Sequence, residues 1–181
     1  MESKIRVYGK AQNRTALGIV NAYLLINPQA TLDDLRMAFP VELNQYYGSL
    51  NYLFYDKSKP IVNERGKDKG ISYNQTAYEW NVFTAPEEIL KLQDGTEVFF
   101  MKLWRSDAFE AVCKHAQQYG IEIADYKPKE GFKKGGYRLE YLNGFEPPVP
   151  EAEVKVPKKL PWWFWLLVAI VLILVILELF K

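Results

Sequence analysis

The residues of this 181-residue chain with the most obvious catalytic chemistry are its one cysteine and its one histidine, Cys113 and His115. A thiol and an imidazole act as a nucleophile and its base only when the two side chains meet. Positions i and i+2 of a helix do not share a face, so this spacing argues against such a pair. Cys113 continues an apolar stripe with Val112 and Ala116, which predicts a core position, and His115 is expected to be solvated.

The acidic pair Asp33–Asp34 is a second candidate, either for a metal or for acid–base chemistry. Both residues follow Thr31 at the start of an expected helix, where carboxylates complement the helix dipole and complete a capping box. Capping therefore explains the pair better than catalysis does. One cysteine and one histidine cannot supply the usual zinc site, and no HExxH, GxSxG, GxGxxG or P-loop motif occurs. We expect no catalytic residues, no metal, no cofactor and no enzymatic activity.

A segment rich in lysine and glycine, KPKEGFKKGGYR at residues 127–138, is the main candidate for a binding site. Glycine-rich loops offer backbone N–H groups to phosphate, lysines add positive charge, and aromatic rings can stack on a base. The segment is predicted to bind a nucleotide or another phosphorylated ligand, or to contact anionic lipid. A solvated hairpin connection explains the same composition and is the favoured interpretation, with ligand binding as the alternative. The predicted ligand-binding residues are Lys127, Lys129, Lys133, Lys134, Gly135, Gly136 and Arg138.

The elements that must position these residues begin with helices. Residues 14–27 place apolar side chains at helical spacing. A second helix follows Thr31 and stops at Pro40. Residues 41–55 favour a third helix that is weakened at Gly48. Together these segments predict a lobe that resembles a helix-turn-helix.

After residue 70 the pattern favours strands. A hairpin is expected at Asp94-Gly95, followed by one helix with Ser106 as its cap and Gly120 as its stop. The predicted fold class is α+β, in which the helix-turn-helix-like lobe is followed by a small antiparallel sheet with one helix. The strands are expected at 70–84, 88–92, 96–104, 121–126 and 137–142, and the helix at 106–120.

The C-terminal segment is the most hydrophobic part of the chain. Residues 160–177 carry no charge, and about 20 apolar residues in a helix span the roughly 30 Å hydrocarbon core of a bilayer. The sequence therefore predicts a single transmembrane helix at 160–180. Lysines before this helix place the preceding residues in the cytoplasm. The residues assigned to the membrane anchor are Lys158, Lys159, Trp162, Trp163 and Trp165.

Three regions follow from this pattern: a cytoplasmic α+β domain at 1–145, a proline-rich linker at 146–159 and a transmembrane anchor at 160–180. The predicted location is the inner, cytoplasmic membrane, crossed once, with the N-terminal domain in the cytoplasm. The single cysteine agrees with a reducing compartment, and the N-terminus shows no apolar run of signal-peptide length.

The balance of charge argues against a nucleic-acid partner. The chain has 23 Lys+Arg and 22 Asp+Glu, so it has no overall field that attracts DNA or RNA. In a winged-helix interpretation the recognition helix lies at 42–54, and this stretch contains no Lys or Arg for phosphate contacts. Its tyrosines and asparagines suit a protein partner instead.

Short motifs between residues 28 and 123 add a further indication. The stretches NPQATLDDLRMAFP, APEEILKLQDGTEVFF, KLW and QQYGIEI follow one another in this order. They resemble an accessory α+β module of bacterial restriction- and defence-associated proteins, over about residues 28–123. The resemblance implies a role beside other domains and carries over no catalytic residues.

The leading hypothesis is therefore a membrane-tethered, non-enzymatic interaction or sensing module in a bacterial defence or stress system, with the bilayer and a protein as partners. An alternative is a membrane effector gated by a nucleotide ligand, whose clustering perturbs the bilayer. A third hypothesis is a membrane-bound winged-helix regulator that binds DNA, against which the charge argues.

Overall fold

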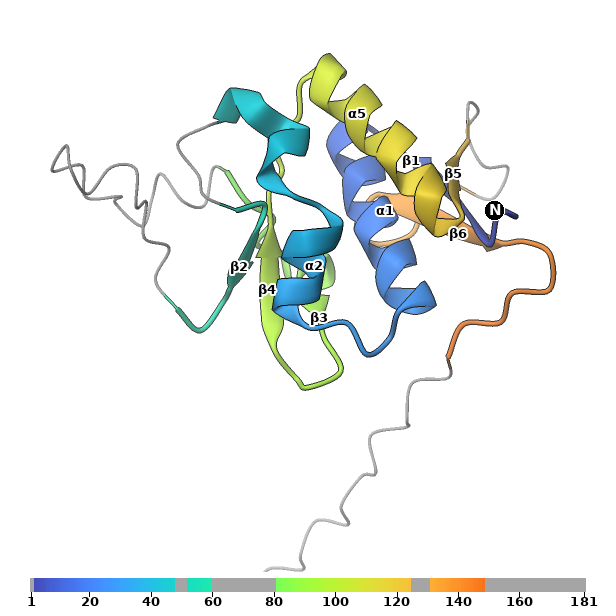
Figure 1. The fold of residues 1–181 in the computed structure, drawn as a ribbon, viewed down its shortest axis with the longest axis horizontal. Helices are drawn as coiled ribbons and strands as arrows, with labels where there is room; N and C mark the ends of the chain where they lie inside the picture. Colours follow the sequence, from blue (N-terminus) through green and yellow to red (C-terminus); the bar gives the residue numbers. More distant parts are fainter. Residues whose placement is uncertain (1, 48–51, 60–80, 125–130, 149–181) are drawn as a thin grey trace, which may run out of the picture. The chain divides into compact units, whose positions relative to one another are not determined.

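A computed structural model describes residues 2–47, 52–59, 81–124 and 131–148 (Figure 1). The chain divides into two compact units, Met1–Pro148 and Val149–Lys181, and every described residue belongs to the first. Its elements, with η for a 3₁₀-helix, are β1 Ile5–Gly9, α1 Gln12–Ile26, α2 Leu32–Ala38, η1 Val41–Tyr47, β2 Phe54–Asp56, η2 Pro86–Glu88, β3 Leu90–Lys91, β4 Glu97–Phe100, α5 Ser106–Ala116, η3 Gln117–Tyr119, β5 Ile121–Ile123 and β6 Tyr137–Tyr141.

The strands β5, β1 and β6 form one sheet with β1 at its centre. β1 runs parallel to β5, where Ile5 lies opposite Ile121, and antiparallel to β6. Ile5 and Val7 are fully buried, and α1 packs on this face of the sheet. Gly18 permits the close approach of α1, because a Cβ atom at this position would lie 2.7 Å from Cγ1 of Val7.

The other face of this sheet carries a network of charged side chains. The Arg6 guanidinium donates to Glu122 on β5 and, at 3.0 Å, to Glu140 on β6. The Tyr8 hydroxyl donates to the same Glu140 carboxylate. Donation from Arg6 lowers the pKa of Glu122, and donation from Tyr8 and then Arg6 lowers the pKa of Glu140. The ionised carboxylates therefore tie the three strands together.

The second sheet contains β2, β4 and β3, and β4 pairs antiparallel with both neighbours. The β3–β4 hairpin turns at Asp94-Gly95, as predicted. The Thr96 N–H donates to the Asp94 carboxylate over 2.8 Å within this turn. An isolated antiparallel bridge joins Val82 to Met101, just beyond β4.

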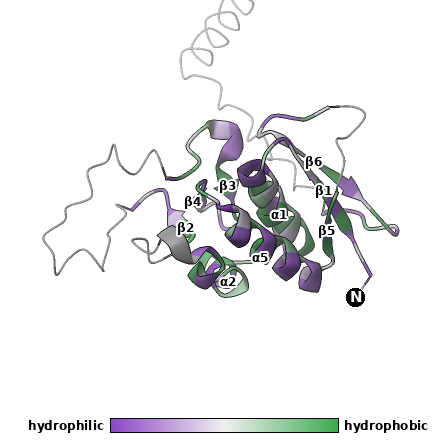
Figure 2. Cartoon of the chain, turned by 90° about the horizontal axis from the view of Figure 1, so that it is seen from above, coloured by the Kyte–Doolittle hydropathy of each residue, from purple (hydrophilic) through white to green (hydrophobic). Residues whose placement is uncertain are grey.

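The three α-helices pack on different partners. α1 covers the β5–β1–β6 sheet, α5 runs alongside α1, and α2 packs against β2 (Figure 1). α2 begins with the capping box expected from the sequence, because the Thr31 hydroxyl accepts from the Asp34 N–H and the Asp34 carboxylate accepts from the Thr31 N–H. Figure 2 shows that α1, α2 and α5 each carry both hydrophobic and hydrophilic residues.

One hydrophobic core joins the two sheets. Ring contacts run through it from Tyr119 to Tyr23, Phe39, Phe54 and Phe100, with successive centroids 4.9, 5.2, 6.2 and 5.1 Å apart. Aromatic pairs at these separations stabilise a core beyond their buried area. Phe39 caps the C-terminus of α2 and lies in the middle of this path, so the core holds α2 from its inner side.

The described residues form an α+β fold, as predicted, but the structure corrects the predicted arrangement of its elements. The described residues form two small sheets rather than one antiparallel sheet, and the β1–β5 pair is parallel. The strand β1 precedes the helices, and α1 and α2 pack on different sheets, so these two helices do not form the predicted helix-turn-helix-like lobe.

The prediction of a single-pass, tail-anchored membrane protein is also corrected. In the part of the chain that the structure describes, no helix is both long and apolar enough to cross a membrane. The longest described helix, α1, has 15 residues, and a spanning helix needs about 20. The segment 160–180, to which the transmembrane helix was assigned, lies outside the described residues.

Other expectations change in detail. The predicted helix at 106–120 is α5 continued by η3 and ends at Gly120, but its N-cap is Arg105 rather than Ser106. The 3₁₀-helix η1, kinked at Asn44, and the strand β2 replace the third helix. Most of the predicted strand at 70–84 lies outside the described residues.

Candidate functional site

The most exposed large apolar side chain in the described part of the chain belongs to Met37, on the outer side of α2. Met37 is 72% exposed, whereas Leu35, Ala38 and Phe39 of the same stretch are buried. Helical spacing explains the difference, because residues 35, 38 and 39 share the face that meets the core. Asp33 lies one turn before Met37 and is exposed as well.

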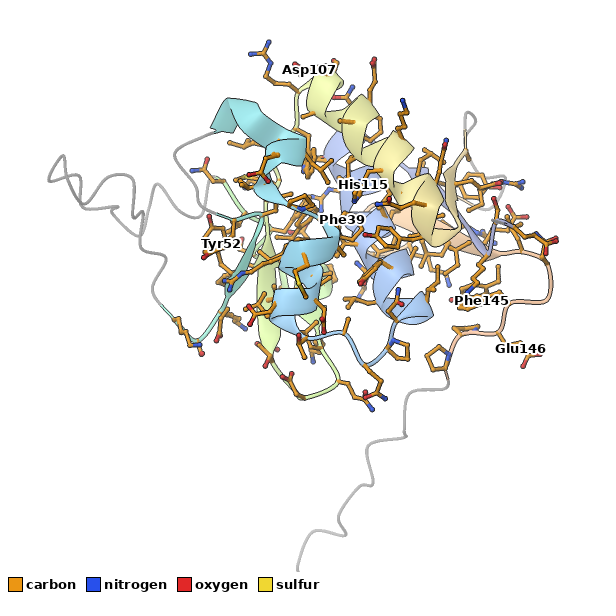
Figure 3. The ribbon with its side chains drawn as sticks, viewed as in Figure 1. Phe39, Tyr52, Asp107, His115, Phe145 and Glu146 are labelled. Atoms are coloured by element: carbon orange, nitrogen blue, oxygen red, sulfur yellow. The ribbon has the colours of Figure 1, made fainter. Side chains whose placement is uncertain are left out.

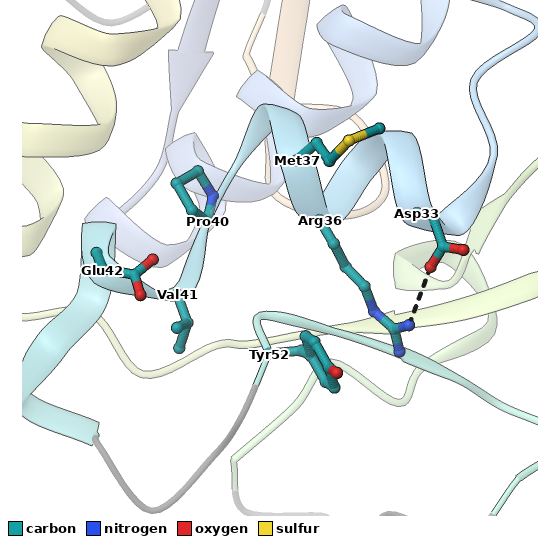
Figure 4. Close-up of a pocket in the computed structure, with 7 residues that line it drawn as sticks. All are labelled: Asp33, Arg36, Met37, Pro40, Val41, Glu42 and Tyr52. Atoms are coloured by element: carbon teal, nitrogen blue, oxygen red, sulfur yellow. Dashed lines mark hydrogen bonds and ion pairs between the residues drawn. The ribbon is translucent and has the colours of Figure 1, made fainter.

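A first groove, of about 460 Å³, lies between α2 and Tyr52, two residues before β2 (Figure 4). The Arg36 guanidinium lies over the Tyr52 ring, 4.0 Å from its centroid, and donates to Asp33 at 3.3 Å. It also donates to the Phe54 carbonyl at 3.4 Å and thus connects α2 to β2. The other lining residues are Met37, Pro40, Val41 and Glu42.

Met37 also borders a second groove of about 460 Å³, between α2 and the C-terminal part of α1. Tyr23 and Tyr119 line this groove, and burial raises the pKa of both phenols, which keeps them neutral. A third groove, of about 230 Å³, shares Gln29 and Ala30 with the second and extends to Asp94. We call the surface formed by these three adjoining grooves, with Met37 between the first two, the α2 face.

The α2 face is acidic. Its lining residues include four carboxylates, Asp33, Asp34, Glu42 and Asp94, and one basic side chain, Arg36. Hydrogen bonds from backbone N–H groups lower the pKa of Asp34 and of Asp94, so both stay ionised at neutral pH. Because Arg36 already pairs with Asp33, the face keeps a net negative charge.

Side chains from α5 and η3 contact the C-terminus of α2. The carbonyl oxygen of Ala38 accepts from the Tyr119 hydroxyl at 3.1 Å and lies 2.6 Å from Nε2 of His115. The His115 ring also lies beside Phe39, with the centroids 5.8 Å apart (Figure 3). His115 is therefore half-buried and contacts the end of α2, and the expectation of a solvated histidine is wrong.

Cys113 packs against the hydrophobic core, as its place in the apolar stripe predicted. Burial raises the pKa of its thiol to about 12, so the thiol is protonated and a poor nucleophile at neutral pH. The described residues also contain no group of three or more His, Cys, Asp and Glu side chains that could hold a metal ion. Asp33 and Asp34 belong to the α2 face described above.

The described members of the predicted phosphate-binding set lie in the turn that leads into β6 and in β6 itself. Lys127 and Lys129 lie outside the described residues. The five that are described are Lys133, Lys134, Gly135, Gly136 and Arg138. Both lysines are exposed, and the turn is closed by the Gly136 N–H, which donates to the Lys133 carbonyl over 3.1 Å.

This turn packs on the start of α1. Gly135 and Gly136 have φ angles of +87° and +75°, in the region that favours glycine. The Arg14 guanidinium donates to the Gly135 carbonyl at 3.4 Å and pairs with Glu88. The backbone N–H of Lys10 donates to the Gly136 carbonyl over 2.9 Å. Lys10 therefore lies next to the turn, which the sequence pattern did not indicate. Packing accounts for the two glycines, and binding of a phosphorylated ligand here stays a prediction.

The predicted anchor residues, Lys158, Lys159, Trp162, Trp163 and Trp165, all lie outside the described part of the chain. Comparisons of the chain with protein-family models, with curated proteins and with solved structures found no match. The resemblance to defence-associated modules therefore stays an expectation, and the function has to be inferred from the geometry of the α2 face.

Proposed function

We propose that the α+β domain is a protein-recognition module that binds a polypeptide partner on the α2 face. The observation that carries this proposal is Met37, which is 72% exposed between two grooves on a helix that is fixed to the core. Methionine, tyrosine and arginine are enriched at protein interfaces, and this surface presents all three in Met37, Tyr52 and Arg36.

The way α2 is held supports the proposal. Phe39 is buried among aromatic rings, the Ala38 carbonyl accepts a hydrogen bond from Tyr119, and Arg36 donates to the Phe54 carbonyl. These contacts fix the helix at its inner side, at its C-terminus and toward β2. A surface that is already ordered loses little conformational entropy on binding, which favours affinity.

The shape of the α2 face favours a polypeptide over a small molecule. Small-molecule sites enclose most of the ligand surface, whereas these grooves are open and Met37 stands between two of them. A polypeptide segment can place one side chain on each side of Met37. Negative charge on the face disfavours DNA, whose affinity depends on positive charge. The proposal keeps the interaction part of the sequence-based hypothesis and involves no catalytic step and no membrane segment.

A photo-crosslinking amino acid in place of Met37 tests this proposal in the organism that makes the full-length protein. We expect a discrete covalent adduct with one other polypeptide. The matched control carries the same crosslinker at Glu110, an exposed position on α5, and should not form this adduct.

With the partner identified, Met37→Gln, which removes the apolar side chain without adding charge, should weaken its binding at least tenfold, or about 1.4 kcal/mol. The thermal stability should stay close to that of the wild type, because the replaced side chain is exposed. If no adduct forms at position 37, or if Met37→Gln binds the adduct-forming partner as tightly as the wild type does, the proposed function is wrong.

A further inference from the structure

The carboxylates of the α2 face are spread over all three grooves. Glu42 and Asp33 line the first groove, Asp34 lines the second and Asp94 lines the third. A polypeptide that runs across α2 therefore lies near negative charge in each of the three grooves, on both sides of Met37. Charge of one sign along a groove attracts ligands of the opposite sign and raises their association rate.

The one basic side chain of the α2 face does not cancel this charge. Arg36 is bound to Asp33, to the Tyr52 ring and to the Phe54 carbonyl, and only 26% of its side chain is exposed. An acidic ligand would have to compete with all of these contacts for the guanidinium. The Asp34 carboxylate accepts hydrogen bonds from Thr31, and the Asp94 carboxylate accepts one from Thr96. These donors are neutral, so the negative charges of Asp34 and Asp94, with that of Glu42 in the first groove, remain for a cationic ligand.

Apolar surface lies between these charges. Pro40 and Val41 line the first groove beside Met37, and Ala30 and Ala38 line the second. A cationic side chain alone would leave this surface uncovered. A segment with a large apolar side chain covers it and removes the Met37 side chain from water, which is favourable in proportion to the apolar area buried.

We infer that the partner binds the α2 face with a basic polypeptide segment in which a large apolar side chain is flanked by lysine or arginine. This inference rests on the proposed function and specifies the chemistry of the partner. A second copy of the same face does not fit, because two acidic surfaces would repel each other. An acidic segment is excluded on the same ground.

A display library of random dodecapeptides, selected on the immobilised full-length protein, provides the probe. Peptides that bind the wild type at least tenfold more tightly than Met37→Gln should combine lysine or arginine with a large apolar residue. Their affinity should fall at least tenfold from low to high salt, because salt screens exposed charges.

The charge variant Asp33→Asn with Glu42→Gln keeps Met37 and removes two negative charges from the first groove. We expect it to bind the selected peptides at least fivefold more weakly at low salt and about as tightly as the wild type at high salt. The matched control, Glu110→Gln, removes one exposed charge from α5 and should bind them unchanged.

The outcomes separate the inference from the proposed function. The inference of a basic partner is wrong if the selected peptides depend on Met37 but are neutral or acidic. It is also wrong if they bind the charge variant as tightly as the wild type at low salt. Neither result contradicts the proposed recognition function. If no selected peptide depends on Met37 and the crosslinker at position 37 forms no adduct, both proposals fail.

Discussion

Truncation of Phe39 tests whether the core holds the α2 face in place. Phe39 is 1% exposed, and its ring centroid lies 5.2, 5.7 and 6.2 Å from those of Tyr23, Tyr119 and Phe54. Replacement of a buried Phe by Ala costs about 3–5 kcal/mol, from the lost transfer free energy and from the cavity that remains. Three ring contacts, each worth about 0.5–1.5 kcal/mol beyond burial, place Phe39→Ala in the upper half of that range, at about 4–5 kcal/mol.

Urea denaturation of the full-length protein, followed by circular dichroism, measures this loss as a lower transition midpoint. A loss of this size is a large fraction of the about 5–15 kcal/mol by which ordinary domains are stable. Phe39→Leu keeps most of the volume and loses the ring contacts, so it should cost about 1–3 kcal/mol. Met37→Ala is the matched control on the exposed side of the same helix, and it should change the stability by no more than about 0.5 kcal/mol.

Two results would refute this reasoning. A loss below about 1 kcal/mol for Phe39→Ala would mean that the aromatic path does not hold α2. A loss for Met37→Ala as large as that for Phe39→Ala would mean that Met37 is packed in the free protein, so the α2 face would not be an open surface.

Three further predictions concern other parts of the domain. Gly136→Ala, at φ +75°, should lower stability by about 1–3 kcal/mol in urea denaturation. Gly144→Ala, at φ +72° where the described residues leave open space, should cost less, and equal losses would show that packing at the turn is unimportant. The lowered pKa values of Glu122 and Glu140 mean that their stabilising contribution is complete above the ordinary glutamate pKa of about 4.3 and disappears as the pH falls through their lower folded-state values. The double variant Glu122→Gln/Glu140→Gln should therefore lose less stability than the wild type on acidification, and parallel pH profiles would contradict the network. The Cys113 thiol, with its pKa raised to about 12, should react with iodoacetamide at least tenfold more slowly in the folded protein than in urea, and equal rates would contradict its burial.

The sequence predicted those elements whose ends are marked by residues nearby in the chain. α2 is bounded by the Thr31 cap and by Pro40, and the β3–β4 hairpin by the Asp94-Gly95 turn. The strand β1 was missed although Ile5 and Val7 alternate with polar residues, because five residues are a weak signal and its partners lie more than 110 positions away. Parallel pairing of β1 with β5 depends on these distant contacts and not on turn residues.

The candidate site was missed for a related reason. The sequence offered one signal, Met37, an apolar residue on the side of α2 away from Leu35 and Phe39. The Tyr52 ring and the Tyr119 hydroxyl reach α2 from other segments, and no local pattern places them there. His115 was expected in solvent because its neighbours in the chain are polar, whereas its actual neighbour is the end of α2.

The central position of β1 delays the folding of its sheet during translation. The ribosome releases the middle strand of this sheet first and its antiparallel neighbour, Tyr137–Tyr141, after nearly all of the domain has been synthesised. Folds that depend on such distant pairings form slowly, and incomplete chains expose apolar surface meanwhile. Ile5 and Val7 stay exposed in the nascent polypeptide until their partner strands have been synthesised. We therefore expect it to bind chaperones during translation more than a domain built from consecutive hairpins would.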